Sequence, residues 1–277
     1  MDTIDAHQHF WQLARGDYGW LTPALAPLYR DFSPGDLRPI ARAAGVARGI
    51  VVQAAPTVAE TRYLLDLARD DPSIAGVVGW VPLDERDAPA LIAEWAGEPK
   101  FKGVRPMLQD LPDDDWIARP ALDPAIGALI ERGLVFDALV FTRHLPYLTE
   151  FARRHRRLRI VLDHGAKPPI ADGAAGWSPW AARVAELAAL PNVFCKISGL
   201  VTEAAVPWTD SMLEPYLSHL IEQFGAARSM WGSDWPVVDM NGGFAAWHAC
   251  AARFAERLQP GERAALFGGT AHACYGI

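Results

Sequence analysis

Residues 3–9, TIDAHQH, form a β-type segment that ends in two histidines one residue apart. In a strand, side chains two residues apart point to the same face, so His7 and His9 should project together near the end of this strand. Neutral imidazole nitrogens placed in this way suit a divalent ion such as zinc. The segment alone is equally consistent with two ordinary polar residues at a strand end, so both interpretations stay open at this point.

Eight segments of this β-type alternate with Ala/Leu/Arg-rich stretches of helical periodicity, which is the pattern of βα units around a parallel sheet. The segments are residues 3–9, 48–53, 75–81, 101–106, 134–140, 159–164, 193–198 and 229–234. Helical stretches follow most of them, for example residues 58–69, 122–132 and 180–190. Eight strands joined by right-handed helical crossovers close into a barrel, so the sequence predicts the α/β class and a (β/α)8 TIM barrel.

The length and the loops favour a single domain over residues 1–277. A chain of 277 residues that is 51% hydrophobic fits one α/β barrel of ordinary size. The Pro/Gly/Asp-rich pieces at residues 110–115 and 167–179 directly follow strand ends, where a barrel carries the loops of its active-site face. The long aromatic loop at residues 11–34 is more typical of a lid or an interface than of a simple connection.

Charge and cysteine content exclude several classes of protein. The net charge is -7 and no Lys/Arg block resembles a phosphate-binding surface, so nucleic acid is not an expected partner. The basic residues 153–157 are predicted to end a helix, where cations complement its dipole. Three widely spaced cysteines, Cys195, Cys250 and Cys274, favour reduced thiols in a cytoplasmic protein. Neither an export signal nor a membrane span is expected, and the sequence leaves the oligomeric state open, a homo-oligomer included.

Two further strand ends carry polar residues suited to catalysis. The sixth segment closes with His164 and the eighth with Asp234. Because the catalytic groups of a barrel come from the ends of several strands, His7, His9, His164 and Asp234 are predicted to meet above the barrel mouth. Taken separately, Asp234 could cap a helix and His164 could be a polar residue in a turn. Four unrelated structural roles are less favoured than one shared site, because all four residues are expected on the same face of the barrel.

Basic side chains and tryptophans lie beside these strand ends. Arg105 is suited to hold a carbonyl or carboxylate through its planar fork, and Lys167 or Lys196 could neutralise a developing oxyanion. Each could instead form a structural ion pair, and strand alternation leaves open whether Lys196 or Cys195 faces the barrel interior. The chain has 11 tryptophans, and those beside the predicted mouth could stack on a sugar or fill the core. They are Trp11, Trp20, Trp80, Trp208 and Trp235.

In these residues the chain resembles the amidohydrolase superfamily. Within that superfamily it is most similar to the sugar lactonases of the amidohydrolase-2 branch, the L-fuconolactonase and L-rhamnonolactonase group. The ordered motifs that carry the resemblance span essentially the whole chain: residues 5–11 (DAHQHFW), 101–105 (FKGVR), 162–164 (LDH) with Lys167-Pro168, 196–200 (KISGL) with Glu203, and 232–236 (GSDWP). The His-x-His alone is a weak signal, but the ordered set is specific.

The resemblance implies a distorted TIM barrel that opens sugar-acid lactones. It implies that Asp234 is the general base that takes a proton from water, and that His164 polarises or protonates the substrate. Arg105 with Lys167 or Lys196 would hold the carbonyl oxygen, and Trp235 would contact the substrate. His7 and His9 would bind either a metal or the lactone. Activated water, a stabilised oxyanion and a proton for the leaving oxygen are all that ester hydrolysis requires.

The chain departs from many members of the superfamily at the fifth strand, whose predicted end carries no histidine. His144 comes later, where a helix is predicted to begin. A mononuclear zinc site needs three protein ligands and an open position, so His7, His9 and Asp234 are only just sufficient. One divalent metal, zinc first, is therefore the expected cofactor, and its requirement for activity is left open. The alternatives are a metal-dependent decarboxylase, which would need a fuller ligand set, and a barrel that binds a sugar acid without turnover.

Overall fold

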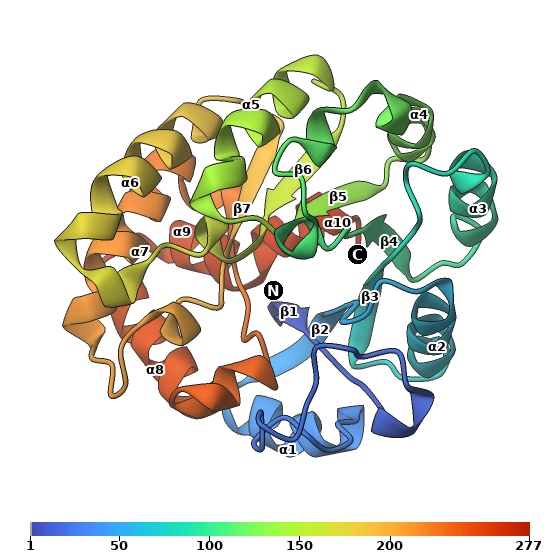
Figure 1. The fold of residues 1–277 in the computed structure, drawn as a ribbon. Helices are drawn as coiled ribbons and strands as arrows, with labels where there is room; N and C mark the ends of the chain where they lie inside the picture. The colour runs from blue at the N-terminus through green and yellow to red at the C-terminus, as the bar shows by residue number, and fades with distance from the viewer. Residues whose placement is uncertain (1) are drawn as a thin grey trace.

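The computed structural model describes residues 2–277 and contains eight parallel strands in the order β1 to β8. Their bounds are β1 Thr3–Gln8, β2 Val46–Val52, β3 Ile74–Gly79, β4 Phe101–Val104, β5 Val135–Ala138, β6 Arg159–Leu162, β7 Val193–Ile197 and β8 Ser229–Trp231. Backbone hydrogen bonds from Asp234 N to His7 O (2.8 Å) and from His9 N to Trp235 O (2.7 Å) join the end of β8 to β1. Figure 1 shows the strands at the centre and the helices around them. The predicted (β/α)8 barrel is confirmed.

Helices alternate with the strands and form the outer layer. They are α1 Pro34–Ala43, α2 Val58–Arg69, α3 Ala88–Trp95, α4 Asp123–Arg132, α5 Leu145–Arg154, α6 Ala174–Ala188, α7 Asp210–Phe224, α8 Gly243–Ala255, α9 Pro260–Ala264 and α10 Thr270–Tyr275. The helix predicted at residues 58–69 matches α2, and that at residues 122–132 matches α4 to within one residue. The predicted end of a helix at the basic residues is confirmed, because α5 ends at Arg154.

Helix α6 begins at Ala174, six residues before the predicted start, so part of the segment expected as a loop is helical. The expectation rested on Gly176 and Pro179, which disfavour a helix. Packing outweighs this preference, because Trp177 and Trp180 both lie against Tyr216 of α7, with ring centroids 5.1 and 5.2 Å away. An aromatic cluster of this size, in which Trp180 and Tyr216 are buried and Trp177 is half-buried, offsets the one backbone hydrogen bond that a proline removes.

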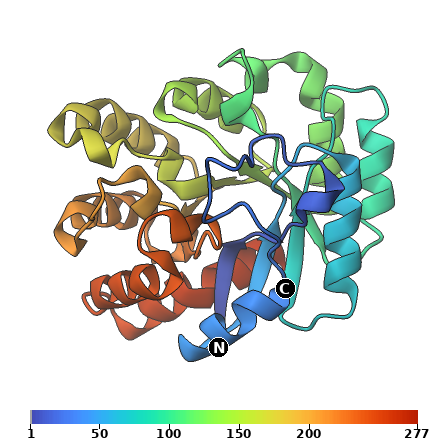
Figure 2. The same cartoon turned by 60° about the horizontal axis from the view of Figure 1, so that its bottom comes forward.

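The barrel interior and the layer between strands and helices form two separate apolar cores. The interior core is closed by α10, which contributes Cys274 and Tyr275. Lys102 Nζ near the start of β4 donates to Gly276 O (3.1 Å), so α10 lies at the amino-terminal end of the strands. Figure 2 shows the red C-terminal helices lying next to β1. This end of the barrel is therefore plugged, and the carboxyl ends of the strands are left for function.

The segment between β1 and α1 packs on the rim of the barrel. Trp11 N donates to Phe32 O (3.1 Å) and Phe32 N to Trp11 O (2.9 Å), so the two ends of the segment are held together. Trp20 Nε1 donates to Ala54 O (2.7 Å), which lies just after β2. The segment thus follows a fixed path over the ends of β1 and β2 (Figure 2).

Cys195, Cys250 and Cys274 are free and buried. Within residues 2–277, the structure contains no helix with both the length and the apolar character needed to cross a membrane.

The closure between β1 and β8 depends on the buried carboxyl of Asp5, whose Oδ1 accepts from His7 N (3.0 Å) and Ser233 N (2.8 Å). We expect Asp5→Ala to lower the free energy of unfolding by about 2–5 kcal/mol, because it leaves two buried N–H groups without an acceptor. Urea unfolding measures this change. Burial raises the pKa of Asp5 to about 7, so a neutral amide should be tolerated and Asp5→Asn should lose far less. Equal losses in the two variants would contradict this role.

Candidate active site

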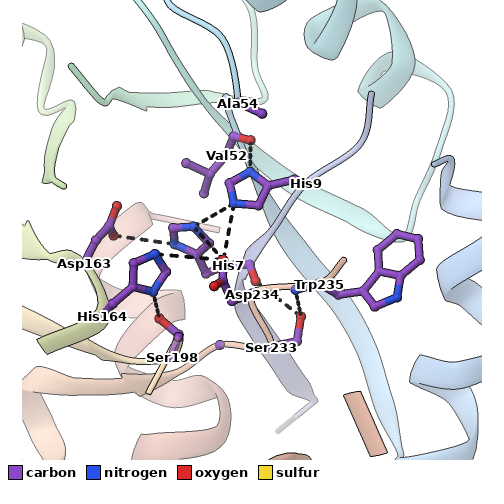
Figure 3. Close-up of polar contacts among 12 residues, drawn as sticks. His7, His9, Val52, Ala54, Asp163, His164, Ser198, Ser233, Asp234 and Trp235 are labelled. Atoms are coloured by element: carbon purple, nitrogen blue, oxygen red, sulfur yellow. Dashed lines mark hydrogen bonds and ion pairs between the residues drawn. The ribbon is translucent and has the colours of Figure 1, made fainter. Parts of the chain in front are cut away.

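A cluster of three imidazoles surrounds the carboxylate of Asp234 at the carboxyl ends of β1, β6 and β8 (Figure 3). From Asp234 Oδ1, the distances are 3.4 Å to His9 Nε2, 3.7 Å to His7 Nε2 and 3.9 Å to His164 Nε2. All four residues are at most 4% exposed. The structure therefore brings together the four residues that were expected to meet at the barrel mouth.

Unusual backbone conformations aim two of these side chains. His164 and Asp234 have φ angles of 53° and 59°, in the left-handed region that non-glycine residues rarely adopt. Each such residue costs on the order of 1–3 kcal/mol, and residues of this kind cluster at functional sites. Gly199 makes room for the imidazole of His164, because a Cβ there would lie 2.5 Å from His164 Nδ1. On the same side, Ser198 Oγ lies 2.8 Å from Nδ1 and fixes the ring.

The electrostatics of the site favour an ionised carboxylate next to a neutral imidazole. Burial acts to raise the pKa of Asp234, but its contacts with His164, His9 and His7 outweigh burial and hold the pKa well below its usual value. Burial lowers the pKa of His164 to about 4, although Asp234 opposes this shift. At neutral pH, Asp234 is therefore a proton acceptor and His164 is a neutral group that can donate a hydrogen bond.

Three donor atoms in this cluster fit a divalent metal: His7 Nε2, His9 Nε2 and Asp234 Oδ1. The two nitrogens are 3.1 Å apart and lie 3.7 and 3.4 Å from the carboxylate oxygen. Ligands about 2.0–2.1 Å from a tetrahedral zinc ion are separated by about 3.3–3.4 Å, so the triangle has the right size. His9 Nδ1 lies 2.7 Å from Val52 O, a contact that orients metal-bound histidines in general.

Arg105 lies beside the cluster at the end of β4 and is 3% exposed. Its Nη1 is 3.3 Å from Asp163 Oδ2 and 3.4 Å from His7 Nε2, and its Nη2 donates to Gln53 O. Its Nε has no hydrogen-bond partner within residues 2–277. The guanidinium is thus held in one orientation, and its Nε–H remains unused.

Lys196 does not occupy the place that the sequence suggested. It faces the barrel interior, is fully buried, and its Nζ contacts Asp137 Oδ2 (2.5 Å), Asp163 Oδ1 (3.1 Å) and His7 Nδ1 (3.1 Å). All three contacts are with buried groups of the barrel interior, two as hydrogen-bond contacts and one as an ion pair, so the expectation that Lys196 binds substrate is corrected. Cys195 packs in the core between the strands and the helices, so of these two neighbouring residues it is Lys196 that faces the barrel interior.

Trp235 also turns away from the site. It is 1% exposed and packs against Phe10 and Phe32, with ring centroids 6.0 and 5.1 Å away. Figure 3 shows its ring directed away from His7 and His9. The left-handed backbone at Asp234 sends the next side chain into the core, so the expectation that Trp235 contacts substrate is corrected. Lys167 remains at the half-buried rim, where its Nζ donates to Gln109 Oε1 (2.7 Å).

A cavity of about 540 Å³ lies over the ends of β2, β3 and β4. Trp20, Trp80 and Trp116 contribute aromatic faces to it, and Asp17 and Asp84 contribute carboxylates. Flat aromatic faces beside hydrogen-bonding groups suit a sugar ring. The sequence places Trp20 and Trp80 beside the predicted barrel mouth. It does not identify Trp116, because the Asp-rich segment before it does not indicate that this tryptophan lines a cavity.

Comparisons with known proteins agree with this geometry. The family described as amidohydrolase matches residues 4–277. An L-fucono-1,5-lactonase of Burkholderia ambifaria is 53% identical over 99% of this chain and 95% of that protein, and one of Burkholderia multivorans is 39% identical over 99% and 96%. A crystal structure of an amidohydrolase from Burkholderia multivorans with bound zinc superposes with a TM-score of 0.95 at 39% identity, covering 100% of both chains. This chain is thus a member of the amidohydrolase family.

Proposed function

We propose that this protein is a lactonase that opens L-fucono-1,5-lactone, or a closely related sugar-acid lactone, in L-fucose catabolism. The observation that carries the proposal is the position of the buried carboxylate of Asp234, whose Oδ1 lies within 3.9 Å of the ring nitrogens of His7, His9 and His164 at the mouth of the barrel. The names of the two curated relatives support the choice of substrate. We further propose that residues 1–277 act as one catalytic domain in the cytoplasm, which suits the three free cysteines.

The proposed reaction adds water to the lactone carbonyl carbon. Asp234 takes one proton from the water as its oxygen forms the new C–O bond. His164 and the guanidinium of Arg105 donate hydrogen bonds to the carbonyl oxygen as it gains negative charge. The ring C–O bond then breaks, and the leaving oxygen takes the proton from Asp234, which regenerates the carboxylate. The product is the open hydroxy acid, whose carboxylate Lys167 at the rim is placed to attract.

His7, His9 and Asp234 would hold the divalent metal, and zinc suits their nitrogen and oxygen donors. When bound, the metal lowers the pKa of a water molecule and polarises a carbonyl. Without it, His7 Nε2 and His164 Nε2 still lie 3.7 and 3.9 Å from Asp234 Oδ1. The proposal therefore includes activity in the metal-free protein, because a lactone is a reactive ester.

The decarboxylase alternative receives less support. Strand β5 ends at Ala138, and its one ionisable residue, Asp137, binds Lys196 inside the barrel. His144 is also unsuited as a ligand, because its Nδ1 accepts from Phe141 N (3.0 Å) and its Nε2 lies 3.2 Å from Asp114 at the rim. The fuller ligand set that metal-dependent decarboxylation would use is not found within residues 2–277.

A screen of sugar lactones with a pH indicator, run with and without a chelator, tests the proposed function. We expect L-fucono-1,5-lactone to release acid faster than its spontaneous opening, and chelation to leave measurable activity. If no lactone is consumed faster than in buffer, the assignment is wrong, and a barrel that only binds the sugar acid becomes the better account. Complete loss on chelation, reversed by zinc, would overturn metal-free activity and leave the lactonase assignment in place.

A further inference from the structure

Directly beneath His7, a chain of buried polar groups runs through the barrel interior. Tyr275 OH of α10 donates to the carboxylate of Asp137, 3.0 Å from each oxygen. Lys196 Nζ also donates to this carboxylate, at 2.5 Å from Oδ2. Lys196 continues the chain to His7 Nδ1 at 3.1 Å. These groups are at most 3% exposed, so the plug of the barrel and the active site are linked by hydrogen bonds that exclude water.

The direction of these hydrogen bonds determines where His7 carries its proton. Lys196 Nζ lies 2.5 Å from Asp137 Oδ2 and 3.1 Å from Asp163 Oδ1, and an amine held between two buried carboxylates is an ammonium, which can only donate. His7 Nδ1 must then be the acceptor, and the neutral ring carries its hydrogen on Nε2. His9 completes the chain: its Nδ1 faces the carbonyl of Val52, which only accepts, so its Nε2 is free to accept from His7 Nε2 at 3.1 Å.

A second tautomer of His7 is also available, with weaker support. In that tautomer Nδ1–H would donate to Asp163 Oδ1 at 3.5 Å, and Nε2 would accept from Arg105 Nη1 at 3.4 Å. The first tautomer uses the shorter contact of Nδ1, 3.1 Å to Lys196 Nζ against 3.5 Å to Asp163 Oδ1, and hydrogen bonds weaken at the longer distance. The structure is thus arranged for the first tautomer while keeping partners for the second.

We propose that Lys196, held by Asp137 and Tyr275, is a positioning residue that selects the tautomer of His7 and so opposes metal binding at the site. A metal on His7 Nε2 requires a lone pair there, and this requires the hydrogen on Nδ1, where Lys196 Nζ now donates. Asp163 would have to replace Lys196 as the partner of Nδ1, in the carboxylate–histidine–metal arrangement common in metal sites. Lys196 and Asp137, which lie behind His7, therefore favour the metal-free form proposed above. The benefit of weaker metal binding rests on the proposed function, but the experiments that test the inference do not.

Removing the lysine should strengthen zinc binding. We expect Lys196→Met combined with Asp137→Asn, which removes both buried charges together, to bind zinc about 10–100-fold more tightly than wild type, the usual size of effects from residues that contact a metal ligand. Zinc affinity is measured on the metal-free protein by competition with a chromophoric chelator. Lys196→Met alone should shift in the same direction, and the double variant keeps the test open if the single one fails to fold. Lys102→Met, which removes a lysine at the far end of the barrel, should leave zinc affinity within twofold.

Nitrogen NMR of the metal-free protein reads the tautomer directly. In wild type, we expect the ring of His7 to show Nδ1 without a hydrogen and Nε2 with one, and in the double variant we expect the reverse. His7→Gln serves only to assign the signals. Unchanged or weaker zinc affinity in the double variant, or a protonated Nδ1 in wild type, would overturn the proposal. Neither measurement involves a lactone, so failure here is distinguishable from failure of the lactonase assignment.

Discussion

Replacing Asp234 with asparagine is expected to lower kcat for lactone opening by a factor of about 10²–10⁴, the usual contribution of a positioned general base. The amide keeps the size of the side chain and an oxygen near the three imidazoles, but it cannot take a proton from water. The same variant should also lose zinc affinity, since a neutral amide is a poorer ligand than a carboxylate. Initial rates with L-fucono-1,5-lactone and the pH indicator measure the first effect.

The control for this variant is Asp113→Asn, an aspartate whose side chain is 55% exposed and pairs with Arg119. It should retain wild-type kcat. The pH profile of wild type gives an independent reading, because His164 gains a proton only near its pKa of about 4, and Asp234 is ionised at still lower pH. We therefore expect kcat/KM to be level from about pH 5.5 to 8 and to fall below pH 5 as His164 becomes charged. Near-wild-type turnover by Asp234→Asn would remove this residue from the mechanism.

The fold was predictable from the sequence because its signals are local and repeated. Eight β-branched segments identify the strands. The predicted ends lie one or two residues beyond the observed ones in the first seven segments and three residues beyond in the last, which extends to residue 234 while β8 ends at Trp231. That difference has a physical cause, because the chain leaves the extended conformation to aim Asp234. The early start of α6 was not predictable, since it depends on Trp177 and Trp180 packing on a helix that is distant in sequence.

The site was predictable where a residue stands at the end of a strand, as His7, His9, His164 and Asp234 do. It was not predictable where the direction of a side chain depends on tertiary contacts. Lys196 is drawn inside by Asp137 and Asp163, two carboxylates on other strands or strand ends, and the role of Asp163 gave no separate signal beside His164. Trp235 follows a residue in the left-handed region, a conformation that a sequence pattern does not reveal.

Arg105→Lys is expected to lower kcat/KM for the lactone by a factor of about 10²–10³, the range seen when one oxyanion donor is removed. The substitution keeps the positive charge, so a large effect would identify the planar fork of the guanidinium as the essential feature. In the structure this fork spans Gln53 O and Asp163 Oδ2 while leaving Nε unused, and a single ammonium cannot make all of these contacts.

The loss should come from the reacting site and not from unfolding of the barrel, because Asp163 keeps its contact with Lys196 when Arg105 is changed. We therefore expect the thermal midpoint of Arg105→Lys to fall by only a few degrees while kcat/KM collapses, a split that a purely structural role would not produce. Arg143→Lys is the matched control, because Arg143 is an exposed arginine of the rim that pairs with Asp114. It should stay within about threefold of wild type. If Arg105→Lys loses less than threefold, the charge alone holds the carbonyl oxygen and the fixed orientation of the guanidinium has no catalytic purpose. Equal losses in both variants would show that the effect is not specific to Arg105.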